Sequence, residues 1–156
     1  MELGRVVQFL RALEHEGVEY VLVGAVALNV HGILRATQVV AIFVRPERGN
    51  VDRLKRALRA VWDDPEIKGI QAADLAGEYP TIRYGPPDED FLIDIMPRLG
   101  EAYGSQDLAA DVVPWQGVNV RVVTPETLYR MKKGTLRGQD HVDAAKLRER
   151  FRFKDP

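Results

Sequence analysis

Apolar residues recur at helical spacing near the start of the chain and predict its first helix. These residues are Leu3, Val6, Val7, Leu10 and Leu13. Charged and amide side chains occupy most positions between them, so one face of the helix would be buried and the other solvated. Gly17 follows the last apolar position and predicts the helix end, because glycine readily adopts the left-handed conformation of a helix C-terminus.

Two apolar runs of strand length follow this helix. Residues 20–23 form a short run that leads directly into Gly24, and residues 39–44 form an unbroken run. A short helix over residues 25–31 separates the two strands. After the second strand Asn50 is placed to cap a further helix. The buried stripe of that helix would be Val51, Leu54, Leu58 and Val61.

The rest of the chain predicts more strands and two closing helices. The strands cover residues 79–84, 91–96, 112–115 and 118–123. The helices begin at Thr124 and at about Gln139. This order predicts a mixed β-sheet flanked by helices, of the α/β or α+β class. We expect one domain over residues 1–156, with a core over about 3–123 and C-terminal helices over about 124–152.

Composition and charge narrow the classes of function. Lys and Arg number 22 and Asp and Glu 23, so the net charge of -1 provides no general attraction to nucleic acid or membrane. The absence of cysteine excludes disulfides, thiolate metal sites and thiol nucleophiles. The first residues enter an amphipathic pattern rather than an apolar signal core, and no apolar run reaches membrane-spanning length. We therefore expect a cytoplasmic protein with no membrane partner.

Asp94 interrupts an apolar face of the strand expected over residues 91–96. Side chains two positions apart on a strand share a face, and the neighbours of Asp94 on its face are Leu92 and Met96. A carboxylate buried there without a partner would be costly. Asp94 is therefore either a solvent-facing strand residue or a residue retained for chemistry.

The order of these segments resembles the opening of the DNA-polymerase-β-type nucleotidyltransferases. The segments that carry the likeness are Val23-Gly24-Ala25, Arg35-Ala36-Thr37, the strand over residues 39–44 and the strand over residues 91–96. The end of the chain is similar to the bacterial branch of AbiEii-type abortive-infection toxins, of the type IV toxin–antitoxin class. That branch has a lysine followed by an arginine and an aspartate at the spacing of Lys132, Arg137 and Asp140, with Asp143 beyond them.

The resemblance implies a nucleotidyltransferase fold and a reaction. The reaction is transfer of a nucleoside monophosphate from an NTP to a hydroxyl group of RNA such as tRNA, of a protein or of a small molecule. Its cofactor is Mg²⁺, because paired magnesium ions neutralise the triphosphate and activate the attacking hydroxyl. In the toxin branch a cognate antitoxin protein is also a partner.

The resemblance also assigns roles to single residues. Asp94 would be the third metal-binding carboxylate. Gly24 and Ala25 would form the strand-to-helix turn at which backbone N–H groups approach the phosphates. The other nucleotide-binding positions would be Arg35, Thr37 and Lys132. Each of these has a purely structural alternative, such as a tight turn, an exposed arginine, the start of a strand or a lysine at a helix end.

The chain departs from this family at the two remaining metal positions. The paired aspartates would fall at positions 39 and 41, which share a strand face, and this sequence has Val39 and Ala41 there. Neither side chain binds a metal, so we predict that the protein is catalytically inactive as it stands. It is either an engineered inactive variant or a natural member retained as a nucleotide-binding or protein-interaction module. A third alternative is a likeness of fold alone, with a site that never bound nucleotide.

The remaining polar residues of interest have plain structural interpretations. We expect Asp140 and Asp143 to cap the last helix and to interact with its dipole. The histidines, which are His15, His31 and His141, have no metal-binding partners at useful spacing. A basic tail is formed by Arg148, Arg150, Arg152 and Lys154. We expect this tail to be a solvated helix end rather than a nucleic-acid contact.

Overall fold

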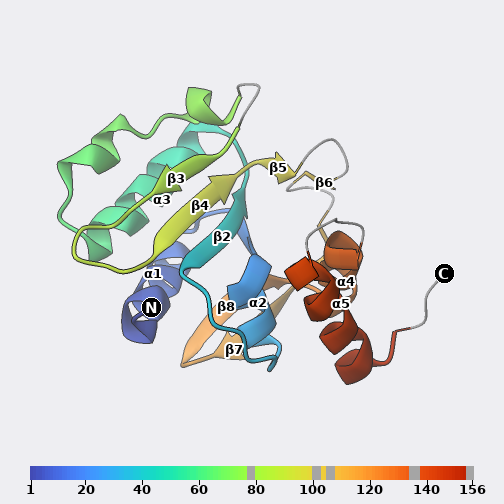
Figure 1. Ribbon diagram of the computed structural model, residues 1–156. Helices are drawn as coiled ribbons and strands as arrows, with labels where there is room; N and C mark the ends of the chain where they lie inside the picture. The colour runs from blue at the N-terminus through green and yellow to red at the C-terminus, as the bar shows by residue number, and fades with distance from the viewer. Residues whose placement is uncertain (77–79, 100–102, 105–107, 134–137, 154–156) are drawn as a thin grey trace.

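A six-stranded sheet in the order β3-β4-β2-β1-β8-β7 forms the centre of the structure (Figure 1). The computed structural model describes residues 1–76, 80–99, 103–104, 108–133 and 138–153. The strands of this sheet are β1 (Tyr20–Val23), β2 (Val39–Val44), β3 (Ile82–Tyr84), β4 (Leu92–Met96), β7 (Ala110–Trp115) and β8 (Val118–Val123). A separate two-stranded sheet pairs β5 (Arg98–Leu99) with β6 (Tyr103–Gly104). Two residues considered above, Arg137 and Lys154, lie outside the described residues.

The sheet is mixed, as the sequence predicts. β2 runs antiparallel to β1 and parallel to β4. β1 is parallel to β8, while β3 and β7 run antiparallel to β4 and β8. β2 therefore lies between β1 and β4, and it carries positions 39 and 41 into the middle of the sheet.

Helices cover the sheet and complete the predicted α+β arrangement. They are α1 (Leu3–His15), α2 (Gly24–Val30), α3 (Arg48–Val61), α4 (Pro125–Lys133) and α5 (Gly138–Phe151), with 3₁₀ turns η1 (Pro65–Gly69) and η2 (Ala72–Leu75). Figure 1 shows α4 and α5 packed together near α2, on the side of the molecule away from β3 and α3. None of the helices in the described ranges is long and apolar enough to cross a membrane.

The amphipathic patterns of α1 and α3 decide how these helices pack. Along α1, Val6, Leu10 and Leu13 are buried, as are Leu54 and Leu58 of α3. The two helices pack against each other, and α1 also packs against β8. Most of the apolar stripes predicted from the sequence therefore form the core behind the sheet. Leu3 is the exception on α1, with 45% exposure, while Val7 and Val61 are only partly buried.

Several element boundaries differ from the predicted ones. β7 begins two residues earlier than predicted, at Ala110, while the bounds of α2 and the start of β4 differ by one residue. β3 begins at Ile82, whereas the predicted strand starts at position 79, which lies outside the described residues. Pro80 precedes β3, and a proline has no N–H group to donate to a strand ladder. The last helix begins one residue earlier than expected, at Gly138. The predicted cap at Thr124 is confirmed, because its Oγ1 accepts a hydrogen bond from the backbone N–H of Thr127 at 3.2 Å.

Asn50 does not cap α3, contrary to the prediction. The helix begins at Arg48, and Asn50 lies inside it with a fully buried side chain. Its Nδ2 donates to the carbonyl oxygens of Glu19 and Arg45, both at 2.9 Å, and its Oδ1 accepts from the N–H of Glu19 at 2.7 Å. Asn50 therefore fastens α3 to the start of β1 and the end of β2, a long-range role that helix-cap patterns do not reveal.

Replacing Asn50 tests this role. Asn50→Ala should lower the free energy of unfolding by about 2–3 kcal/mol, because it leaves buried backbone groups without partners. The matched control is Asn119→Ala on the exposed face of β8, which should change it by no more than about 0.5 kcal/mol. Urea denaturation followed by circular dichroism measures both, and equal values for the two variants would contradict the assignment.

Candidate functional site

A cavity of about 370 Å³ brings together the residues that the sequence singles out. The predicted site residues that line it are Gly24, Ala25, Arg35, Thr37, Val39, Ala41, Asp94 and Lys132. They come from the β1–α2 junction, the loop before β2, the strands β2 and β4, and helix α4. The structure therefore places every one of these predicted positions at one cleft, although they are far apart in the chain.

The register of the strands explains how positions 39 and 41 meet Asp94. Val39 and Ala41 are partly exposed, whereas the alternate residues Val40 and Ile42 are fully buried on the other face. In the parallel pair of β2 and β4, Ala41 lies opposite Asp94. Aspartates at these two positions would therefore point into the same cleft as Asp94.

Gly24 is required by its conformation and by its surroundings. Its φ angle is 72°, in the left-handed region that disfavours residues with a Cβ atom. A Cβ atom added to it would lie 3.3 Å from the Cβ of Ala41. The predicted tight turn is therefore present, and it brings the backbone of β1 close to the floor of the cleft.

The carboxylate of Asp94 is paired with Arg83, a residue that the sequence did not single out. Nε of Arg83 donates to Oδ1 of Asp94 at 2.8 Å, and Nη2 donates to Oδ2 at 3.1 Å. The two residues lie directly opposite each other in the antiparallel pair of β3 and β4. Their hydrogen bond raises the pKa of Arg83 further, so the guanidinium remains charged. The signal in the sequence was a cationic side chain on the strand adjoining Asp94, but strand register was needed to recognise the pair.

An ionic network with buried carboxylates includes three residues of the cleft lining, which are Arg35, Lys132 and Asp140. Nζ of Lys132 lies 3.2 Å from Oδ1 of Asp140 and 3.1 Å from Oδ2 of Asp143. Nη1 of Arg35 donates to the same Oδ2 of Asp143 at 2.6 Å, and Gln139 donates to its Oδ1 at 2.9 Å. The network joins the loop before β2 to α4 and α5, so it determines where these helices sit relative to the cleft.

This network corrects the capping role predicted for the two aspartates. Asp140 lies in the first turn of α5 but accepts from Lys132. Asp143 lies beyond the first turn and its side chain is fully buried. Buried charges must be paired. Here the partners are Lys132 of α4 and Arg35 of the loop before β2. Lys132 is itself buried and is not a solvated helix end.

Thr37 serves the local backbone. Its Oγ1 accepts a hydrogen bond from the N–H of Val39 at 3.1 Å, and the backbone N–H of Arg35 donates to Oδ1 of Asn29 at 3.0 Å. These bonds hold the loop that enters β2. The loop thus fixes Arg35 and Val39 at the edge of the cleft.

The cleft does not fit a pair of magnesium ions. Magnesium requires several oxygen ligands in near-octahedral geometry. Asp94 accepts two hydrogen bonds from Arg83, and Val39 and Ala41 offer no oxygen. Among the described residues there is no group of three or more His, Asp or Glu side chains that could hold a metal ion.

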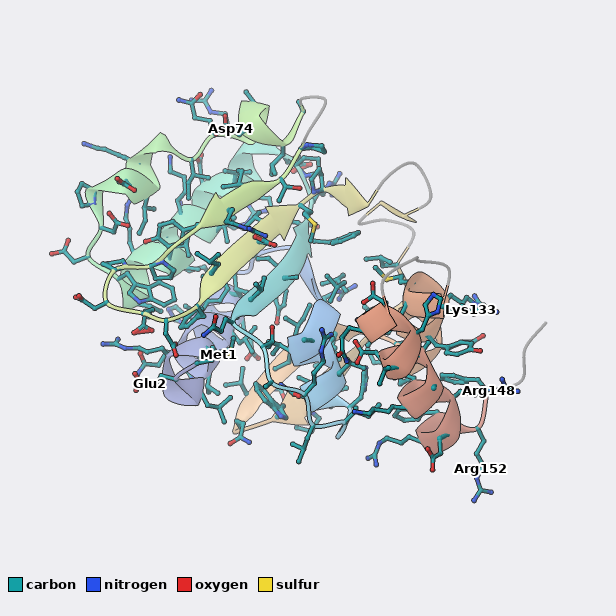
Figure 2. The ribbon with its side chains drawn as sticks, viewed as in Figure 1. Met1, Glu2, Asp74, Lys133, Arg148 and Arg152 are labelled. Carbon is teal, nitrogen blue, oxygen red and sulfur yellow. The ribbon has the colours of Figure 1, made fainter. Side chains whose placement is uncertain are left out.

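A second hollow of about 660 Å³ lies against α4 and α5 and contains none of the predicted site residues. Lys133, Arg148 and Arg152 line it, and Figure 2 shows them on the side of these helices that faces away from the sheet. Arg150 instead donates from Nε to the carbonyl oxygen of His31 at 2.7 Å. The described part of the basic tail is thus exposed, as predicted, while Arg150 also anchors α5 to the end of α2.

Comparisons with known proteins support the fold. No protein-family model matches the chain, and no curated protein matches its sequence. The structure is similar to that of TM1012 from Thermotoga maritima, classed as a nucleotidyltransferase, with a TM-score of 0.58 and 14% identity over 96% of this chain and 91% of that one. JHP933 from Helicobacter pylori gives a TM-score of 0.56 and 16% identity over 95% of this chain and 65% of that one.

The antibiotic-resistance factor ANT(2'')-Ia is a further structural neighbour. Its solution structure gives a TM-score of 0.54 and 14% identity over 97% of this chain and 91% of that one. Its crystal structure in complex with adenylyl-2''-tobramycin gives a TM-score of 0.53 and 15% identity. The predicted nucleotidyltransferase fold is therefore confirmed, whereas the AbiEii-type branch stays a prediction.

The buried network predicts a large effect of a conservative change. Asp143→Asn should lower the free energy of unfolding by about 3–5 kcal/mol, because it removes the carboxylate partner of Arg35 and leaves the buried Lys132 with Asp140 alone. The control is Glu126→Gln, which breaks the exposed pair with Arg130 on α4 and should change it by no more than about 1 kcal/mol. Urea denaturation of both variants is the measurement, and a comparably small loss for Asp143→Asn would show that the network is not structural.

Proposed function

We propose that this protein binds a nucleotide in the cleft and does not transfer it. The observation that carries the proposal is the pairing of Asp94 with Arg83 beside Val39 and Ala41. The one carboxylate that remains at the metal positions is neutralised by a side chain, in a wall that is otherwise apolar there. A cleft of this kind keeps the shape of the fold without the ligands for two-metal chemistry.

The lining of the cleft suits a ligand with an apolar ring and a charged group. Its apolar side chains are those of Val23, Ala25, Val39, Ala41, Phe43, Met96, Leu128 and Met131. A cavity of about 370 Å³ lies within the usual range for small-molecule sites, which combine apolar walls with a few polar groups. Arg35 and Arg83 supply donors for phosphate oxygens at its edge. The neighbour ANT(2'')-Ia, whose structure contains an adenylylated product, supports a nucleotide as the ligand class.

The likeness to AbiEii-type toxins extends the proposal to the protein's ancestry. The active ancestor would have used Mg²⁺ and an NTP to modify a hydroxyl group of RNA such as tRNA, of a protein or of a small molecule. A cognate antitoxin would then be a protein partner. The codons at positions 39 and 41 in the source genome separate an engineered inactive variant from a natural pseudoenzyme: aspartate codons would indicate engineering.

Titration with each of the four NTPs, with and without Mg²⁺, tests nucleotide binding directly. We expect at least one NTP to bind in the micromolar to millimolar range, with an affinity that falls as salt rises. No labelled nucleotide should be incorporated into RNA or protein. Failure of all four NTPs to bind would contradict the binding proposal, and incorporation would contradict the inactive assignment.

A variant that fills the cleft locates the binding site. Val39→Phe should weaken NTP binding by at least about tenfold, because the larger ring occupies space that the ligand needs. The control is Val112→Phe on β7, where the native side chain is 60% exposed, and it should bind as the parent protein does. Calorimetry measures both, and unchanged binding by Val39→Phe would place the ligand elsewhere.

Restoring both aspartates should restore a metal site. The double variant Val39→Asp, Ala41→Asp brings three carboxylates together. When a chelator removes all metal these carboxylates repel one another, so the double variant should melt at a lower temperature than the parent protein. Magnesium at about ten times its dissociation constant should then stabilise the double variant by about 1.4 kcal/mol, or about 3–6 °C. Neither single variant should respond as strongly, since both positions are needed to hold the metals.

The control for this experiment has the same spacing at a different place. Val112→Asp with Pro114→Asp puts two carboxylates on the exposed side of β7, and magnesium should not stabilise it. Thermal melting with and without magnesium compares the variants. If the cleft variant responds no more than the control, positions 39 and 41 are not former metal positions.

A further inference from the structure

Arg83 is the most accessible cation among the described residues that line the cleft. Its side chain is 61% exposed, compared with 20% for Arg35 and 8% for Lys132. Lys132 and Arg35 are engaged with the buried carboxylates of α5. A ligand that enters the cleft therefore meets the guanidinium of Arg83 before the other two charges.

Arg83 also keeps hydrogen-bond donors for a ligand. A guanidinium has five N–H donors in a rigid fork, and the pair with Asp94 uses Nε and Nη2. Nη1 has no hydrogen-bond partner in the described part of the chain. Its two donors have the planar geometry that suits phosphate oxygens.

Asp94 holds this guanidinium in place. Two parallel hydrogen bonds at 2.8 and 3.1 Å and the direct cross-strand register restrict the side chain on β3. A flexible arginine would lose rotamer entropy on binding, whereas a restricted one has lost part of it already. Asp94 thus acts on a ligand through Arg83, as a positioning residue.

We infer that Arg83 takes the place of the metal, so that the cleft binds the metal-free form of a phosphorylated nucleotide. This inference rests on the proposed function and specifies the form of its ligand. Nη1 of Arg83 donates to a phosphate oxygen, and Asp94 orients the guanidinium. Magnesium on the ligand opposes binding in two ways: it occupies phosphate oxygens, and it carries positive charge and bound water toward Arg83 and an apolar wall.

A comparison of ATP in EDTA with ATP in excess magnesium tests the inference. The parent protein should bind metal-free ATP about tenfold more tightly than the magnesium complex. A factor of about ten is what one charge-assisted hydrogen bond contributes to affinity. Arg83→Gln should weaken binding of metal-free ATP by about tenfold and leave the two forms equal. The matched control is Arg45→Gln, which removes an exposed, ion-paired arginine at the end of β2 outside the cleft and should retain the parent's preference.

A double-mutant cycle tests the role of Asp94. Asp94→Asn keeps the shape of the side chain but removes its charge, so it should weaken metal-free ATP binding several-fold through loss of orientation. The double variant Asp94→Asn, Arg83→Gln should lose little more affinity for metal-free ATP than Arg83→Gln alone, because the two residues act as a unit. Additive losses would mean that Asp94 does not work through Arg83. Arg83→Lys, which keeps the charge but not the fork, should bind metal-free ATP with intermediate affinity.

The outcomes separate this inference from the proposed function. If the parent binds the magnesium complex as tightly as metal-free ATP, or if Arg83→Gln binds like Arg45→Gln, the inference is wrong and nucleotide binding still stands. If the parent binds neither form, the proposed function fails as well. Melting curves in EDTA show whether each variant is folded. If Arg83→Gln does not fold, Arg83→Lys takes its place in the binding comparison.

Discussion

The pairing of β2 with β1 on one side and β4 on the other is the constraint on which the cleft depends. This pairing sets Ala41 opposite Val23 in one direction and opposite Asp94 in the other. The left-handed turn at Gly24 follows directly and lies against Ala41. A slip of one residue in β2 would turn positions 39 and 41 into the core and bring Val40 and Ile42 into the cleft. The buried alternate residues prevent that slip, so the hydrophobic core maintains the geometry of the cleft.

Charge compensation is the second principle of the cleft. The cationic groups of Arg35, Lys132 and Arg83 each have a carboxylate partner, supplied by Asp143, Asp140 and Asp94. Charges removed from water must be paired within the protein, and these pairs meet that demand without a metal ion. Arg83 is the most exposed of the three, so its remaining donors are the most accessible to a ligand. The buried pairs of Arg35 and Lys132 therefore contribute to stability, whereas the exposed Arg83 is available to a ligand.

The sequence predicted local features well and long-range ones poorly. Apolar periodicity identified the helices and the strands that build the sheet. The order of small motifs identified a set of site residues, all of which line the cleft. Asn50 and Asp143 were misassigned to helix caps, because their partners lie far away in the chain or across a helix pair. Arg83 was missed for a related reason. Its significance depends on which residue faces it across β3 and β4, and no local pattern encodes that register.

The balance of charges also bears on why the fold would persist without catalysis. Two further carboxylates at positions 39 and 41 would add negative charge beside Asp94, where one guanidinium is available. Such a cluster is unfavourable unless metal ions neutralise it. Valine and alanine remove that repulsion and place apolar side chains on strand positions that are already partly buried. Catalytic residues commonly cost stability in this way. Under the proposed function, valine and alanine at these positions leave a fold whose core, register and paired charges are mutually consistent. The cleft then suits the proposed ligand, which needs no metal.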